Sequence, residues 1–193
     1  MAEYSPSARD GLIVVDLQVD FCPGGALAVT EGDEIVSSVN GLLEIPGWMK
    51  VATRDWHPAD HMSFQAQGGF WPVHCVAETA GAAFHPSMNT PDVEMVVSKA
   101  TIRDAEAYSG FDGTTLADDL RAAGIGRLFV CGLATDYCVR ATALDARREG
   151  FEVVVLEDAI RAVNVDPKDG ENAIEEMRAA GCAFALSSDI RSV

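Results

Sequence analysis

Residues 127–158 read RLFVCGLATDYCVRATALDARREGFEVVVLED, and this stretch decides the fold. It begins with the apolar run RLFVCGL and ends with a second one, FEVVVLED. Between them, residues 136–150 follow a helical pattern that closes on Gly150, a residue type that often ends helices. Apolar runs without alternation are typical of strands buried on both faces, so the stretch predicts a strand–helix–strand unit of a parallel sheet.

The same alternation continues outward from this unit in the N-terminal and C-terminal directions. Further apolar runs predict strands at GLIVVDL (11–17), MKVATRD (49–55), VEMVVSK (93–99) and GCAFALS (181–187). Helical patterns cover residues 30–44, 114–124 and 166–181, and the pair Thr30 and Asp33 has the spacing of a helix cap. The sequence therefore predicts an α/β fold: a doubly wound, six-stranded, mainly parallel sheet with helices on both faces.

The 193 residues are enough for one domain with a sizeable core. No linker or repeat divides them, so we expect a single domain over residues 1–193, with a short frayed arm at 1–10. The long irregular stretch 56–92 contains all four histidines. Because long loops in compact domains are usually functional, we expect residues 56–92 to be a functional loop region.

Charge and composition exclude several classes of protein. The net charge of −16 repels phosphate backbones and anionic lipid, so we expect neither nucleic acid nor a membrane as partner. No apolar run approaches the length of a membrane helix, and the first residues lack the apolar core of a secretory signal. Five cysteines, an odd number, argue against a disulfide scaffold. We therefore expect a cytoplasmic protein.

Three reactive side chains stand where predicted strands end, the edge at which open α/β sheets bind ligands. Asp16 ends the first strand, Lys99 ends the third, and Cys138 lies at the start of the helix after the fourth. Each alone has an ordinary explanation, as a turn residue, a solvated lysine or a packing cysteine. Their shared edge favours chemistry, because a helix N-terminus and a nearby lysine would lower the pKa of the Cys138 thiol.

A second group of polar residues follows the second predicted strand. The motif RDWHPADH (54–61) and the later His74 supply one carboxylate, Asp55, and three imidazoles, counting His57 and His61. Imidazole and carboxylate ligands suit Zn²⁺, Fe²⁺ or Mn²⁺. Histidines in loops are also commonly just exposed, so on these residues alone a metal site and a solvated loop both stay open.

Four motifs, in order along nearly the whole chain, resemble those of the isochorismatase-like cysteine hydrolases. They are VVDLQVDFCPGGALAV (14–29), TRDWHPADHMSF (53–64) with FWPVHCV (70–76), SKATIRDAEAYSGFDGTTL (98–116) and GLATDYCVRATALDA (132–146). The second motif resembles the family's metal-binding branch, the nicotinamidases. A single motif of this kind is weak evidence, whereas four in register are strong evidence.

The resemblance implies a catalytic triad of Asp16, Lys99 and Cys138. In this scheme Asp16 accepts the thiol proton and later gives it to departing ammonia, while Lys99 stabilises the thiolate. Cys138 attacks the amide carbonyl to form a thioester, which water hydrolyses. The implied oxyanion hole consists of the backbone N–H groups of Ala134 and Cys138, with a cis peptide between Leu133 and Ala134.

The resemblance also implies a ligand set and a substrate pocket. One divalent metal ion (Zn, Fe or Mn), and no organic cofactor, would bind to Asp55, His57, His61 and His74, so residues 56–92 would be a metal-binding loop region. A pyridine nitrogen on this metal would turn the carboxamide toward the thiol. The candidates to sandwich the ring are Phe21, Trp71 and Tyr108.

The activity implied is an amidase of NAD salvage that converts nicotinamide to nicotinate and ammonia and also accepts pyrazinamide. One alternative is another cysteine hydrolase of this fold, acting on a different amide, ureido compound or vinyl ether. Another is a non-catalytic protein in which the histidine cluster is a structural metal clip. Relatives of this fold occur as monomers and as larger assemblies, so a homo-oligomer is compatible with the resemblance.

Overall fold

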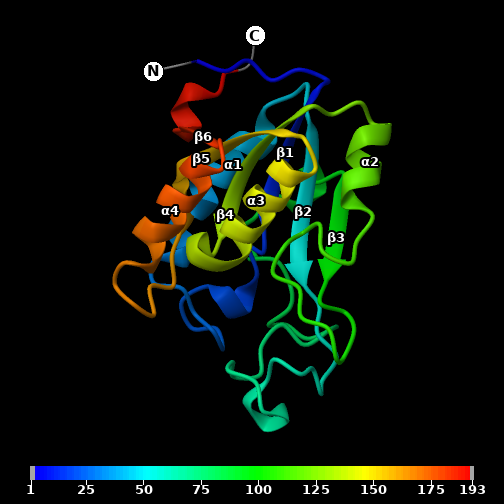
Figure 1. Ribbon diagram of the computed structural model, residues 1–193, viewed down its shortest axis with the longest axis vertical. Helices are drawn as coiled ribbons and strands as arrows, with labels where there is room; N and C mark the ends of the chain where they lie inside the picture. Colours follow the sequence, from blue (N-terminus) through cyan, green and yellow to red (C-terminus); the bar gives the residue numbers. More distant parts are fainter. Residues whose placement is uncertain (1–2, 192–193) are drawn as a thin grey trace.

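The computed structural model describes residues 3–191, and within them six strands form one sheet in the order β3-β2-β1-β4-β5-β6 (Figure 1). Every neighbouring pair is parallel. The strands are β1 (Asp10–Val15), β2 (Met49–Asp55), β3 (Met95–Lys99), β4 (Arg127–Leu133), β5 (Glu152–Arg161) and β6 (Ala183–Ala185). The predicted α/β sheet is confirmed, and it is parallel throughout.

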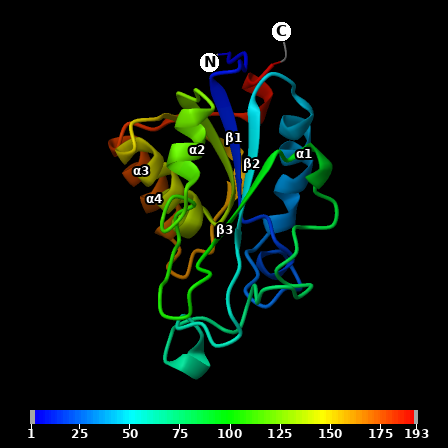
Figure 2. The same ribbon diagram turned by 90° about the vertical axis from the view of Figure 1, so that its right-hand side faces the viewer.

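Helices cover both faces of the sheet, as the sequence predicts. They are α1 (Val36–Glu44), α2 (Leu116–Ala122), α3 (Arg140–Arg148) and α4 (Asp169–Ala179). Figure 2 shows α1 on one face and α2, α3 and α4 on the other. No helix of the described residues has the length and apolar character needed to cross a membrane.

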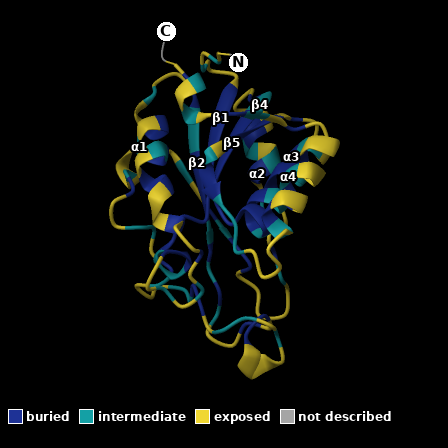
Figure 3. Ribbon diagram, turned by 90° about the vertical axis from the view of Figure 1, so that its left-hand side faces the viewer, coloured by how far each residue is buried: buried dark blue, intermediate teal, exposed yellow. Residues whose placement is uncertain are grey.

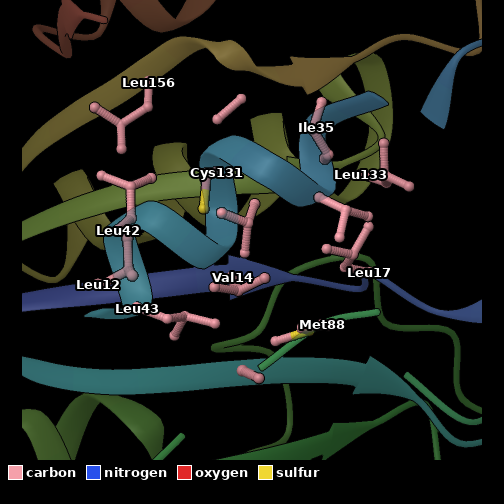
Figure 4. Close-up of a cluster of buried hydrophobic side chains, with 14 of the residues drawn as sticks. Leu12, Val14, Leu17, Ile35, Leu42, Leu43, Met88, Cys131, Leu133 and Leu156 are labelled. Carbon is pink, nitrogen blue, oxygen red and sulfur yellow. The ribbon is translucent and has the colours of Figure 1, made fainter. Parts of the chain in front are cut away.

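Strand β1 explains why two cores form, because successive side chains of a strand point to opposite faces. Leu12 and Val14 pack in the layer under α1 (Figure 4), whereas Ile13 and Val15 pack in the layer under the other helices. All six residues of β1 are buried, and Figure 3 shows the sheet enclosed between its helices. Burial on both faces is the reason for the unbroken apolar runs in the sequence.

The strand order reverses at β1, since β2 lies on one side of it and β4 on the other. In open α/β sheets such a reversal leaves a crevice beyond the carboxyl ends of the strands, and ligands bind there. Asp16 follows β1 and Ala134 follows β4 at this point. The segment that follows β2 extends beyond the same edge in Figure 1, below the arrowheads of β2 and β3, and the chain then returns past α1, where Met88 packs in the core.

The start of α1 differs from the predicted cap at Thr30 and Asp33. The chain passes through Glu31, at a φ of 57°, into a 3-10 turn at Gly32–Ile35, and α1 begins at Val36 without a side-chain cap. Backbone carbonyls accept the first N–H groups of the turn, with Gly32 N bonded to Val29 O at 3.1 Å. The turn therefore satisfies donors that a side-chain cap would otherwise serve.

The predicted frayed arm at 1–10 is corrected over its described residues. Tyr4 N donates to Asp189 O at 2.8 Å, and Arg191 N donates to Tyr4 O at 2.9 Å. The Tyr4 ring also packs edge-on against Phe129, with 5.4 Å between ring centroids. Pairing with the C-terminal segment and burial of the ring hold this stretch against the sheet. The extent of the single domain over 1–193 stays a prediction.

Candidate active site

The three predicted reactive residues lie together at the carboxyl edge of the sheet. Asp16 directly follows β1, Lys99 is the last residue of β3, and Cys138 lies in a π-helical turn (Thr135–Val139) between β4 and α3. The Lys99 Nζ lies 2.9 Å from Asp16 Oδ2 and 3.5 Å from Cys138 Sγ. All three side chains are buried, so their charges interact with little solvent screening.

The buried Lys99 ammonium contacts two carboxylates and one backbone carbonyl, and these contacts favour its charged form. Besides Asp16 it forms a very short ion pair with Asp55 and donates to Ala107 O at 3.2 Å. Burial acts to lower the pKa of Lys99, but Asp16 and Asp55 raise it, and the net result is a pKa well above the ordinary value. The lysine is therefore a fixed positive charge at the centre of the site.

The pKa values of the Cys138 thiol and the Asp16 carboxyl are both higher than the sequence suggests. Burial raises the pKa of Cys138 well above its ordinary value, and Asp16 and Asp55 raise it further against the opposing effect of Lys99. The predicted lowering of this pKa is thus wrong, because burial and two carboxylates outweigh one lysine. Burial also raises the pKa of Asp16, again against Lys99. A raised pKa makes Asp16 a better acceptor for a thiol proton.

The loop that carries Cys138 is fixed by its backbone and by one buried carboxylate. The peptide between Leu133 and Ala134 is cis, which confirms that prediction. Asp136 accepts hydrogen bonds from Val163 N at 2.9 Å and Asn164 N at 2.8 Å. The two hydrogen bonds of Asp136 join the π-helical turn to the segment after β5. Asp136 lies inside the motif at 132–146, but nothing in the sequence indicates these contacts, so sequence reasoning missed it.

Three of the four predicted metal ligands converge beside the triad. Asp55 ends β2, and its Oδ2 lies 3.5 Å from His57 Nε2 and 4.0 Å from His74 Nε2. The three side chains can place one ligand atom each within 4.8 Å of one another. Burial acts to raise the pKa of Asp55, but Lys99 and then His57 outweigh it and hold that pKa below its usual range. An ionised carboxylate is the form that binds a metal.

The orientation of the two imidazoles tests whether a metal fits this set. His57 Nδ1 lies 3.2 Å from Ala100 O, and His74 Nδ1 lies 2.8 Å from Pro72 O. A backbone carbonyl that takes Nδ1–H leaves Nε2 with a free lone pair, the usual arrangement around metal-binding histidines. His57 Nε2 is buried without a hydrogen-bond partner in residues 3–191. The donor set and this unpaired nitrogen both fit a divalent metal ion.

His61 stands apart from the other three predicted ligands. Its ring stacks on His57 with 4.3 Å between centroids, but both of its nitrogens have protein partners. Nδ1 lies 2.8 Å from Ser63 Oγ, and Nε2 lies 3.1 Å from Ala105 O. The structure therefore brings the His61 ring beside the cluster without directing a nitrogen into it.

A pocket opens onto the Cys138 thiol and onto two of the predicted metal ligands, Asp55 and His74. The three predicted aromatic residues, Phe21, Trp71 and Tyr108, also line it. A mostly apolar lining with a few converging polar groups is typical of a small-molecule site.

The pocket also has wall residues that the sequence analysis did not identify. They are Leu27, Val29, Glu106, Tyr137 and Val163, beside Ala134 of the implied oxyanion hole. Tyr137 packs edge-on against Trp71, with ring centroids 5.2 Å apart, and Trp71 Nε1 donates to Tyr108 OH at 3.1 Å. The place of Tyr137 next to Cys138 in the chain is the one signal that could have indicated it.

Gln18 is a further residue that sequence reasoning missed. Its Nε2 donates to Asp55 O at 2.8 Å and to Ala82 O at 2.9 Å, and its Oε1 accepts from Asp55 N at 2.8 Å. The side chain is fully buried, so these bonds meet no competition from water. Gln18 thus fixes the backbone of Asp55, whose side chain faces both Lys99 and the imidazoles.

Comparison with known proteins gives consistent results over nearly the whole chain. The family model described as the isochorismatase domain matches residues 10–189. Nicotinamidase/pyrazinamidase of Mycobacterium tuberculosis is 43% identical over 92% of this chain and 98% of its own length.

Solved structures agree with that sequence comparison. The pyrazinamidase of Pyrococcus horikoshii in complex with zinc is 51% identical, with a TM-score of 0.87 over 92% of this chain and 99% of that one. PnC1 from L. infantum in complex with nicotinate is 39% identical, with a TM-score of 0.95 over 100% of both chains.

Proposed function

The chain belongs to the isochorismatase family, and on this premise we propose that it hydrolyses nicotinamide to nicotinate and ammonia through a thioester on Cys138. One observation carries the proposal: the Cys138 thiol and two of the proposed metal ligands, Asp55 and His74, line the same pocket. A structural metal clip has no need of a nucleophile beside it. Similarity to nicotinamidases over nearly the whole chain supports the same substrate.

The triad geometry supports a cysteine mechanism. Asp16 takes the proton of the Cys138 thiol as the sulfur attacks the amide carbonyl, and their reactive atoms lie within 4.8 Å of each other. Lys99 holds the Asp16 carboxylate and stabilises the thiolate from 3.5 Å away. As the C–N bond breaks, Asp16 returns the proton to the departing ammonia. Water then hydrolyses the thioester, which releases nicotinate and restores the thiol.

Charge that develops on the carbonyl oxygen needs donors aimed at it. The backbone N–H groups of Ala134 and Cys138 are the proposed donors. Ala134 lines the pocket, and its carbonyl accepts hydrogen bonds from Tyr137 N and Val139 N, both at 3.1 Å. These two bonds fix the Ala134 peptide relative to the turn that carries the sulfur, so the two donors keep one relative position.

Asp55, His57 and His74 would hold the divalent metal ion. When bound, the metal supplies a Lewis acid for the nitrogen of the substrate ring. His61 joins this set only if its contact with Ala105 O breaks, so its role as a ligand stays a prediction. These donors suit Zn, Fe and Mn alike.

The aromatic wall orients the ring of the substrate. Phe21, Trp71 and Tyr108 supply apolar faces, and the bond from Trp71 Nε1 to Tyr108 OH fixes two of these rings relative to each other. Pyrazinamide has a ring nitrogen in the equivalent place, so the same pocket accepts it. A cytoplasmic location and a homo-oligomeric state stay predictions from the sequence.

Ammonia release from nicotinamide by the metal-loaded protein tests the proposal. We expect turnover by the wild type and a loss of about 10³-fold or more in Cys138→Ala, because the thioester cannot form. Cys182→Ala is the matched control, since Cys182 is also a buried free thiol but lies outside the pocket. No turnover by the folded, metal-loaded wild type would contradict the substrate, and unchanged turnover in Cys138→Ala would contradict the mechanism.

A further inference from the structure

Two glutamate or aspartate side chains line the pocket, and they differ in how their charge is balanced. Asp55 forms an ion pair with Lys99. Glu106 forms no ion pair with any residue from 3 to 191. Its Oε1 accepts a hydrogen bond from the backbone N–H of Ala107 at 3.1 Å, which leaves the carboxylate without a neutralising cation of the protein.

The segment after β3 brings Glu106 close to both the aromatic wall and the reactive end. The next residue, Ala107, gives its carbonyl to Lys99 Nζ at 3.2 Å. The residue after that, Tyr108, lines the pocket, and Glu106 adds to the effect of burial in raising the pKa of the Tyr108 phenol. Glu106 is half-buried, so its field acts across the pocket with partial screening by solvent.

The reaction changes the charge of what the pocket holds. A neutral carboxamide and water enter, the C–N bond breaks, and a carboxylate forms together with ammonia, which takes up the acid proton as ammonium. The neutral substrate interacts only weakly with a nearby negative charge. The anionic product is repelled by it, and the repulsion grows where solvent is excluded.

We propose that Glu106 is a specificity-determining residue that makes the pocket favour neutral carboxamides over the matching carboxylates and so promotes release of the acid product. This inference rests on the proposed function, since it assumes a carboxamide substrate.

The variant Glu106→Gln isolates the charge, because glutamine keeps an oxygen that can accept the bond from Ala107 N. Asp104→Asn is the matched control. Asp104 is an exposed carboxylate of the same segment that lies outside the pocket lining, and its partner Arg103 keeps its ion pair with Asp60 at 2.9 Å. Both variants remove one negative charge from the same loop, but only one of them removes it from the pocket.

The measurement is the pair of dissociation constants for nicotinate and nicotinamide, made in a metal-loaded Cys138→Ala background so that no turnover occurs. We expect Glu106→Gln to bind nicotinate about three- to tenfold more tightly, with nicotinamide binding changed by less than about twofold. The gain should shrink at about 0.5 M salt, because salt screens a partly exposed charge. Asp104→Asn should change neither constant.

Kinetics of the enzymes with Cys138 intact give a second readout. We expect Glu106→Gln to lower the inhibition constant for nicotinate by a larger factor than any change in the KM for nicotinamide. An unchanged nicotinate constant would overturn the inference, and so would equal tightening of both ligands, which would indicate a change of pocket shape. The wild type could release no ammonia while Glu106→Gln still tightens nicotinate binding selectively. That result would refute only the proposed function. No binding of either ligand would refute both.

Discussion

At the scale of single residues, Asp55 joins the two halves of the site. One of its carboxylate oxygens pairs with Lys99, and the other faces His57 Nε2 at 3.5 Å and His74 Nε2 at 4.0 Å. A metal bound to the second oxygen would therefore withdraw negative charge from the lysine. The charge state of the triad depends in this way on whether the metal set is filled.

The contrasting surroundings of two histidines lead to a prediction about metal binding. We expect His57→Ala to lower metal affinity at least about tenfold, because it removes a buried nitrogen that has no hydrogen-bond partner among residues 3–191. His61→Ala should retain metal, because the His61 nitrogens already bond Ser63 and Ala105. Metal content after dialysis against a graded chelator measures both variants. Equal metal loss in the two would instead return His61 to the ligand set.

At the scale of elements, the ends of β1 and β2 are tied together by the Gln18 side chain. Backbone hydrogen bonds align the strands and continue to Asp16, whose N–H donates to Thr53 O at 3.2 Å. Beyond that point the Gln18 side chain joins the segment after β1 to Asp55, the last residue of β2. Asp55 is a proposed metal ligand and also pairs with Lys99. A shift of its backbone would therefore displace both the metal set and the lysine.

We therefore predict that Gln18→Met loses metal affinity and stability together. Three buried backbone groups lose their partner, at about 1–3 kcal/mol for each one left unsatisfied. Asn40→Leu is the control: Asn40 also bridges two segments, with bonds to Ser87 O at 2.7 Å and from Asn89 N at 2.9 Å, but far from the pocket lining. It should lower the free energy of unfolding without weakening metal binding. Normal metal affinity in folded Gln18→Met would contradict the positioning role.

The sequence was sufficient to predict the strands and the placement of Asp16, Lys99 and Cys138 at one edge of the sheet. Buried parallel strands require unbroken apolar runs, and the chemistry requires particular residue types just after them. The contacts of Gln18, Asp136 and His61 could not be predicted. They depend on which backbone groups from distant segments lie within reach, as when Gln18 bonds Ala82, 64 residues away. The pKa of Cys138 was misjudged for the same reason, since burial is a property of the fold.

At the scale of the whole molecule, a net charge of −16 acts on stability. Like charges on one compact surface repel each other, and the unfolded chain relieves that repulsion by expanding. The described ion pairs are mostly exposed, and such pairs contribute little to stability. Screening of the net repulsion should therefore outweigh weakening of these pairs when salt is added.

We predict that the melting temperature rises by a few degrees between about 20 mM and 500 mM NaCl, at constant metal loading. Thermal unfolding followed by circular dichroism measures the change. An uncharged osmolyte at matched osmolality is the control for effects of water activity. A melting temperature that stays level or falls with salt would show that local ion pairs outweigh the net repulsion.

The convergence of the triad at the strand reversal has a consequence for how the protein acquires activity. Lys99 and Cys138 are 39 residues apart in the chain, and Arg127 and Asp10, whose side chains pair at the opposite end of the sheet, are 117 apart. Closing such long loops is costly and slow, so contacts of this kind form only as the complete topology does. No short contiguous fragment of the chain contains all the proposed residues of the centre, which extend from Asp16 to Cys138. A newly synthesised chain therefore cannot assemble the centre until β1, β2, β3 and β4 have been made and have paired, and this keeps the proposed nucleophile and the metal-binding cluster apart in a half-folded chain.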